Sequence, residues 1–138
     1  MARILAAIAF IAGLAPAIAL ADAQAYLCIA DQAVGFTYDK NPKAWKSTLF
    51  SVKDERYILK LKDKHWHWSK LGSSFEGTCN DFTTADTIGC VGTEEVLFNR
   101  TTLRYQLYYP FGYIAQMTLE SFEGSDTPYI EIGRCSEM

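Results

Sequence analysis

Two histidines stand two residues apart in the run His65-Trp66-His67-Trp68. In an extended strand, successive side chains point to opposite faces, so both imidazoles would share one face and both tryptophans the other. Two imidazoles are half of the ligand set that holds zinc or copper in a protein. The other interpretation places the tryptophans in the core and the histidines in water. We predict this second arrangement, and we keep a metal-binding or enzymatic protein that uses His65 and His67 as the alternative function.

Four cysteines, Cys28, Cys79, Cys90 and Cys135, follow the N-terminal segment, and no cysteine lies within it. An even number of cysteines in a short exported chain indicates disulfides. Residues 80–89 between Cys79 and Cys90 fit a connection between adjacent strands, so we predict the pairs Cys79–Cys90 and Cys28–Cys135. The second bond would tie the first strand to the last, and these two strands are neighbours in a closed barrel. A zinc site needs close cysteine pairs such as C-x-x-C, which this sequence lacks.

No other pattern in the sequence matches a catalytic motif. There is no G-x-S-x-G nucleophile elbow and no glycine-rich phosphate loop. Oxidised cysteines are neither nucleophiles nor zinc ligands. We therefore predict a protein that is not an enzyme and that carries no cofactor and no metal.

The N-terminal segment has the three parts of a secretory signal, which are an early cation, an apolar run and small residues at an A-x-A site. Cleavage fits after Ala21 or after Ala23, and Pro16 at the end of the apolar run favours Ala23. We expect residues 1–23 to be a cleaved signal peptide and residues 24–138 to be one domain. The mature protein would be periplasmic or secreted, with no membrane span after cleavage.

Charge divides the sequence into two parts. Residues 40–70 hold nine Lys or Arg and three Asp or Glu, which gives +6, whereas residues 71–138 hold three Arg and ten Asp or Glu, which gives −7. We expect the two parts to complement each other across neighbouring strands. The net charge of −3 argues against nucleic acid as the partner.

Polar and apolar residues alternate along most of the chain after residue 24, which is the period of a strand with one buried face. Turn residues such as Gly, Pro, Asn and Asp separate the runs. This spacing predicts an all-β domain, either a small antiparallel barrel or a sandwich, of about seven to nine strands with two disulfides. A barrel is favoured because it leaves no open edge. The clearest strands are Arg56–Lys62, His65–Trp68, Leu103–Leu107, Tyr113–Leu119 and Pro128–Ile132, and the expected core includes Trp66, Trp68, Phe98, Tyr105 and Leu107.

Aromatic residues are concentrated in Tyr108-Tyr109-Pro110-Phe111-Gly112-Tyr113. Aromatic side chains exposed at a hairpin tip are typical of binding surfaces, because such residues are enriched at interface hot spots. The alternative is a rigid turn whose rings belong to the core. Tyr108, Tyr109, Phe111 and Tyr113 are therefore candidate binding residues.

Two resemblances add to this interpretation. The segments Tyr26-Leu27-Cys28-Ile29-Ala30-Asp31 and Pro128-Tyr129-Ile130-Glu131-Ile132-Gly133-Arg134-Cys135-Ser136, with Gly35-Phe36-x-Tyr38-Asp39 and Trp45, resemble short exported bacterial proteins of uncharacterised function. Tyr26-x-Cys28 and Trp68-Ser69-Lys70 near Gly72 are similar to signatures of the periplasmic inhibitors of C-type lysozyme, although Leu71 interrupts the Lys-Gly pair of that family. The second resemblance implies a small disulfide-bearing barrel and assigns Ser69 and Lys70 to the contact with the inhibited enzyme.

Together these patterns predict an exported binding protein without catalytic activity. Its partner would be a protein, such as an envelope or host hydrolase of the lysozyme type, or a small ligand in a barrel mouth.

Overall fold

The structure is a computed structural model, and it describes residues 25–82, 86–113, 124 and 126–138. The predicted signal peptide, residues 1–23, lies outside this part, as do residues 114–119 of the predicted strand Tyr113–Leu119. No helix in the described part is long and apolar enough to cross a membrane. The described residues form nine strands: β1 (Ala25–Asp39), β2 (Ala44–Phe50), β3 (Arg56–Lys62), β4 (His65–Lys70), β5 (Gly77–Phe82), β6 (Thr87–Val91), β7 (Glu95–Asn99), β8 (Arg104–Tyr109) and β9 (Tyr129–Glu137).

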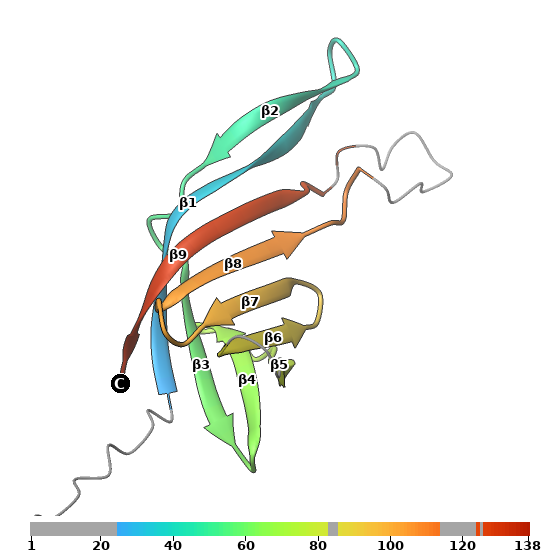
Figure 1. Cartoon of the computed structure of the whole chain (residues 1–138). Coiled ribbons are helices and arrows are strands. Elements are labelled where there is room, and N and C mark those ends of the chain that lie inside the picture. Colours follow the sequence, from blue (N-terminus) through green and yellow to red (C-terminus); the bar gives the residue numbers. More distant parts are fainter. Residues whose placement is uncertain (1–24, 83–85, 114–123, 125) are drawn as a thin grey trace, which may run out of the picture.

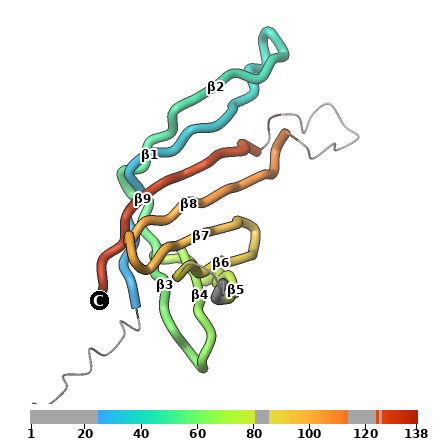
Figure 2. Tube along the Cα trace, viewed as in Figure 1, coloured from blue at the N-terminus to red at the C-terminus, as the bar shows by residue number. Residues whose placement is uncertain are grey.

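Eight of these strands close into an antiparallel barrel. They follow one another in the order β1-β3-β4-β5-β6-β7-β8-β9, and β9 pairs back with β1. The remaining strand, β2, pairs with β1 and extends with it beyond the barrel as a hairpin (Figures 1 and 2). The prediction of a small antiparallel barrel of seven to nine strands is therefore confirmed.

The first strand takes part in both the barrel and the hairpin. β1 pairs with β3 as far as Ile29 and with β2 from Ala33 onward, while β9 lies along its other edge. An irregularity in the β1–β9 register lies between Ala30 and Gln32. Because a bulge adds one residue, the buried positions of β1 change from even to odd numbers there. Val34 and Phe36, which follow the bulge, consequently face outward.

The barrel core contains all five of the predicted residues. Leu61 shares a face with Tyr57 and Leu59 in the alternation of β3 but remains 38% exposed, because β1 pairs with β3 only as far as Lys60. Both predicted disulfides are also present, and each joins two residues that are directly opposite on adjacent strands. The exposed fractions of the predicted core residues are 6% for Trp66, 4% for Trp68, 0% for Phe98, 3% for Tyr105 and 0% for Leu107.

Gly133 lies where β1, β8 and β9 come close together, and it faces Tyr105 across the sheet. A Cβ atom at this position would lie 2.3 Å from the backbone oxygen of Ile29 and 2.4 Å from Cε1 of Tyr105. We expect Gly133→Ala to lower the free energy of unfolding by about 1–3 kcal/mol, the usual cost of overpacking a core. Gly77→Ala is the matched control, since its Cβ would be 3.7 Å from its nearest neighbours. Equal losses for both variants in urea unfolding would contradict this explanation.

Candidate functional site

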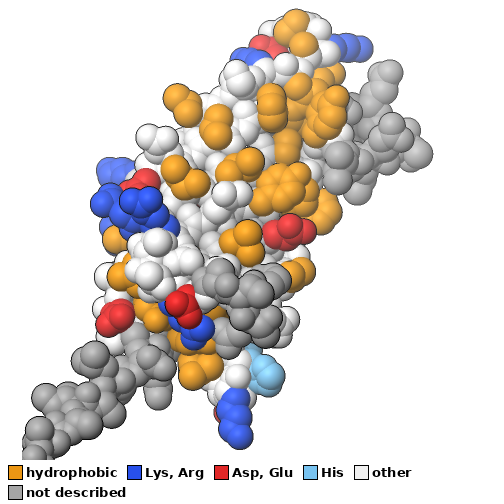
Figure 3. All heavy atoms as spheres, in the orientation of Figure 1, with side chains coloured by type: hydrophobic (Ala, Val, Ile, Leu, Met, Phe, Trp, Pro, Cys, Tyr) orange, Lys and Arg blue, Asp and Glu red, His pale blue; other side chains and the backbone are white. Residues whose placement is uncertain are grey.

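Four large apolar side chains form a row across the outer face of the sheet. Leu49 on β2 is opposite Val34 on β1, Val34 is opposite Ile130 on β9, and Ile130 is opposite Tyr108 on β8. Their exposed fractions are 80%, 48%, 42% and 41%, respectively. We call these four residues the apolar row. Figure 3 shows hydrophobic side chains gathered on this face of the molecule. Contiguous exposed apolar residues are a common feature of interaction sites.

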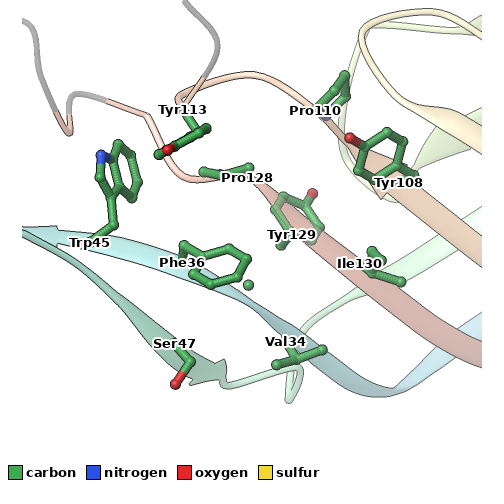
Figure 4. Close-up of a pocket in the computed structure, with 11 residues that line it drawn as sticks. Val34, Phe36, Trp45, Ser47, Tyr108, Pro110, Tyr113, Pro128, Tyr129 and Ile130 are labelled. Atoms are coloured by element: carbon green, nitrogen blue, oxygen red, sulfur yellow. The ribbon is translucent and has the colours of Figure 1, made fainter.

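A cavity of about 610 Å³ adjoins the apolar row, between the β1–β2 hairpin and the ends of the β8–β9 connection. We call it the aromatic groove. Trp45 and Tyr113 meet edge to face with ring centroids 5.6 Å apart, and Phe36 and Pro128 lie beside them (Figure 4). Its volume is within the range of ligand pockets, and its walls are largely apolar and aromatic. The lining residues are Val34, Gly35, Phe36, Trp45, Ser47, Tyr108, Pro110, Tyr113, Pro128, Tyr129 and Ile130.

Hydrogen bonds and close backbone contacts hold the walls of the groove in place. The backbone N–H of Phe36 donates to the carbonyl oxygen of Pro128 at 3.1 Å. The Tyr109 hydroxyl donates to a carboxylate oxygen of Asp126, and this bond raises the pKa of Tyr109 to about 12. Gly112 has φ +116° and lies against the backbone of Asp126, where a Cβ would not fit. The start of the β8–β9 connection, at Gly112, therefore contacts its end, at Asp126, and the end is hydrogen-bonded to the β1–β2 hairpin through Pro128.

The structure separates the four aromatic residues predicted to bind a partner. Tyr108 and Tyr113 line the groove and are 41% and 65% exposed. Tyr109 instead packs against the core, where its ring stacks on Tyr129 at 5.5 Å. Phe111 is exposed and contacts Tyr109, away from the groove lining. Phe36, which was not among the predicted binding residues, could have been recognised from the alternation of large residues at positions 34, 36 and 38.

Ser69 and Lys70 line a different and smaller cavity of about 190 Å³ at the end of β4. The Lys70 ammonium is 2.5 Å from a carboxylate oxygen of Glu55. This ion pair holds the Lys70 side chain against its own barrel. The charge of Lys70 is therefore already paired within the chain.

A carboxyl group is buried inside the barrel near these residues. Glu131 is 1% exposed and accepts hydrogen bonds from the hydroxyls of Tyr105 at 2.7 Å and Tyr57 at 3.3 Å. Burial raises the pKa of Glu131, and burial also raises the pKa of both tyrosines, so they remain protonated donors. The Tyr57 hydroxyl also lies 3.2 Å from a carboxylate oxygen of Glu55. Because solvent does not reach Glu131, we assign this network to the packing of the barrel.

The two histidines lie as predicted on the outer face of β4, with Trp66 and Trp68 buried. Lysines occupy the facing positions of β3, since Lys62 is opposite His65 and Lys60 is opposite His67. Glu76 pairs with Lys60 at 2.5 Å and lies 3.8 Å from Nδ1 of His67. This pair joins the basic and acidic parts of the chain, whereas Lys70–Glu55 lies within the basic part and Arg100–Asp86 within the acidic part. In the described ranges, no group of three or more His, Cys, Asp or Glu is arranged to hold a metal ion.

Another depression, of about 630 Å³, lies over the outer face of β8 and β9. Arg134 donates two hydrogen bonds to the carboxylate of Asp31, at 2.8 and 2.9 Å, and these bonds lower the pKa of Asp31. The charges that line this depression are thus already partly paired within the chain. The aromatic groove and the apolar row are the better candidates for recognition, because exposed apolar groups gain most from being covered.

The chain matches no protein-family model, no curated protein and no solved structure.

Proposed function

We propose that this protein is an exported, non-catalytic binding protein that recognises a partner protein through the aromatic groove and the apolar row. The observation that carries the proposal is the exposure of Phe36, Tyr108 and Tyr113 on one face, next to apolar strand positions. Aromatic side chains supply a large share of the energy at protein interfaces. The open shape of the groove suits an inserted side chain or loop of a partner.

Export is supported by two independent features. The sequence predicts a cleaved signal peptide in residues 1–23. Two disulfides join all four cysteines, and such bonds form and persist in oxidising compartments. We therefore propose a periplasmic or secreted location.

A C-type lysozyme is the first partner to test, because of the sequence resemblance to lysozyme inhibitors. The net charge of −3 would assist an encounter with a cationic enzyme. That resemblance assigns the contact to Ser69 and Lys70, but the ion pair of Lys70 with Glu55 favours the aromatic groove instead. Inhibition that is lost in Lys70→Ala and kept in a groove variant would move the site to the smaller cavity.

We expect Phe36→Asp to weaken partner binding by about 30-fold or more, the effect of losing an interface hot spot of about 2 kcal/mol. Phe36 is 51% exposed, so the variant should fold normally. Leu97→Asp is the matched control, because Leu97 is 50% exposed on the outer face of β7 and lies outside the groove lining.

The measurement has two steps. Lysozyme inhibition is assayed directly with the wild type and both variants. In parallel, immobilised mature protein captures partners from an envelope extract, and each captured protein is purified and titrated by calorimetry. A partner that binds the wild type and Leu97→Asp equally, and Phe36→Asp weakly, supports the proposal. A partner that does not distinguish Phe36→Asp from the wild type would show that the groove is not the binding site.

A further inference from the structure

The strand β2 forms an edge of the sheet. Within the described part of the chain it pairs with β1 alone, and its seven residues are all exposed or partly exposed. Figure 1 shows it at the outer side of the projecting hairpin. An edge strand presents N–H and C=O groups that can pair with another chain. β2 contains no proline and only one charged residue, Lys46, which already forms an ion pair with Asp39 at 3.2 Å.

The hydrogen bonds of β1 show which backbone groups of β2 point outward. Phe36 donates its N–H to Pro128, on the side of β1 away from β2. In an antiparallel ladder, both backbone groups of one residue point to the same side. Phe36 and its β2 partner Ser47 are therefore a non-hydrogen-bonded pair. The N–H and C=O of Ser47 point to the outer edge of β2, and by alternation those of Leu49 do so as well.

Only a few two-fold registers are available to a pair of β2 strands. An axis at Lys46 would bring two lysines directly opposite each other, which is destabilising. An axis at Thr48 would place Lys46 opposite an apolar phenylalanine, Phe50. An axis at Ser47 avoids both problems, and because Ser47 is the central residue of β2 it is the axis that aligns all seven residues of the strand. It pairs the outward backbone groups of Ser47 with those of a second Ser47, and it places each Leu49 opposite the Trp45 of the other copy.

This register also extends the apolar row. Leu49 ends the row in a single chain and is 80% exposed. In the Ser47 register, Trp45 of the second copy would stand directly beside Leu49 on the same face. Aromatic and aliphatic residues at facing positions stabilise a sheet. The large-small-large pattern of Trp45, Ser47 and Leu49 is the same in both directions, so the edge is complementary to itself.

We propose that two copies of this chain form a two-fold dimer in which their β2 strands pair antiparallel, with Ser47 opposite Ser47. Such an interface is isologous, as in most homodimers. It joins the two sheets into one and gives the pair a continuous apolar face that includes both apolar rows. This inference goes beyond the proposed function: Leu49 belongs to the apolar row and Trp45 and Ser47 line the aromatic groove, but the dimer is tested in the absence of any partner protein.

Cysteine cross-linking tests the register. Directly opposite residues in a hydrogen-bonded pair have Cα atoms about 5.5 Å apart, which a disulfide can span. We expect Ser47→Cys to form a covalent dimer on mild oxidation, seen on a non-reducing gel, with both native disulfides intact by peptide mapping. Leu49→Cys is the control, because its two copies would be about 13 Å apart along the strands. Efficient cross-linking of Leu49→Cys, or none of Ser47→Cys, would overturn the register.

A second experiment tests the dimer without added cysteines. We expect the wild-type protein to be dimeric in sedimentation equilibrium, and Leu49→Lys to raise the dimer dissociation constant about tenfold or more, as truncating an interface residue does. Leu97→Lys places the same charge at another exposed apolar position and should leave the dimer unchanged. A wild type that stays monomeric at its highest soluble concentration, or a dimer weakened equally by both variants, would overturn the proposal.

Discussion

Replacing Cys28 and Cys135 with alanine is expected to lower the free energy of unfolding by about 5 kcal/mol in the loop-entropy description of disulfides. This bond joins residues separated by 107 positions, so it restricts almost the whole unfolded chain. Replacing Cys79 and Cys90, which are separated by 11 positions, is expected to cost about 3 kcal/mol. Natural domains are stable by only about 5–15 kcal/mol, so the first variant is expected to be partly unfolded at physiological temperature.

The two variants are matched controls for each other. All four cysteines are at most 8% exposed, and each pair lies directly opposite on neighbouring strands, so the packing lost is similar. Urea unfolding of both variants under non-oxidising conditions measures the difference. If the two losses are equal, or if their order is reversed, the length of the closed loop does not set the stability of this barrel.

Replacing Glu131 with alanine is expected to lower the free energy of unfolding by about 3 kcal/mol or more, the second largest effect. The Tyr105 hydroxyl would lose its carboxylate acceptor while remaining buried, which costs about 1–3 kcal/mol. The missing side chain would also leave a cavity in a site that is 1% exposed. The Tyr57 hydroxyl would still lie 3.2 Å from Glu55, so its contribution to the loss is smaller.

Glu131→Gln separates the charge of this group from its packing. Burial raises the pKa of Glu131 in the folded protein above the ordinary value of 4.5. A carboxyl group with a raised folded pKa contributes stability that is fully present below its unfolded pKa and is lost as the pH rises through the folded pKa. Glutamine does not ionise, so this loss is absent from the variant. The stability of Glu131→Gln relative to wild type should therefore increase with pH and then level off above the folded pKa.

Urea unfolding at several values from about pH 4 to about pH 8 measures this difference. Glu94, a half-buried carboxyl whose pKa is also raised by burial, is present in both proteins. A difference that is constant over the whole range would show that Glu131 has the same pKa in the folded and unfolded states.

The sequence predicted those parts of the fold that depend on local alternation. Trp66 and Trp68 are buried and His65 and His67 face outward, as the period of two requires. The disulfide pairs were also predictable, because Cys79 and Cys90 are close in sequence and the remaining pair follows from barrel closure. The strand β2 was not predicted, since both of its faces are largely exposed and its residues therefore do not alternate in polarity.

The candidate site was predicted only in part. The aromatic segment Tyr108–Tyr113 is visible in the sequence, but Tyr109 belongs to the core and Phe111 lies outside the groove lining. Phe36 and Trp45 join Tyr113 in the groove only because β9 pairs with β1 and brings the hairpin beside the β8–β9 connection.

Residue types, alternation and cysteine spacing were enough to predict an all-β domain, with a barrel favoured over a sandwich, and its two disulfides. Alternation acts between neighbouring residues, and closure of the barrel brings the first strand, with Cys28, beside the last, with Cys135. Three features came only from the folded chain: the bulge that turns Val34 and Phe36 outward, the hairpin that extends past the barrel, and the groove beside it. Each depends on contacts between segments far apart in the sequence. A local pattern carries no information about which distant segment will lie alongside.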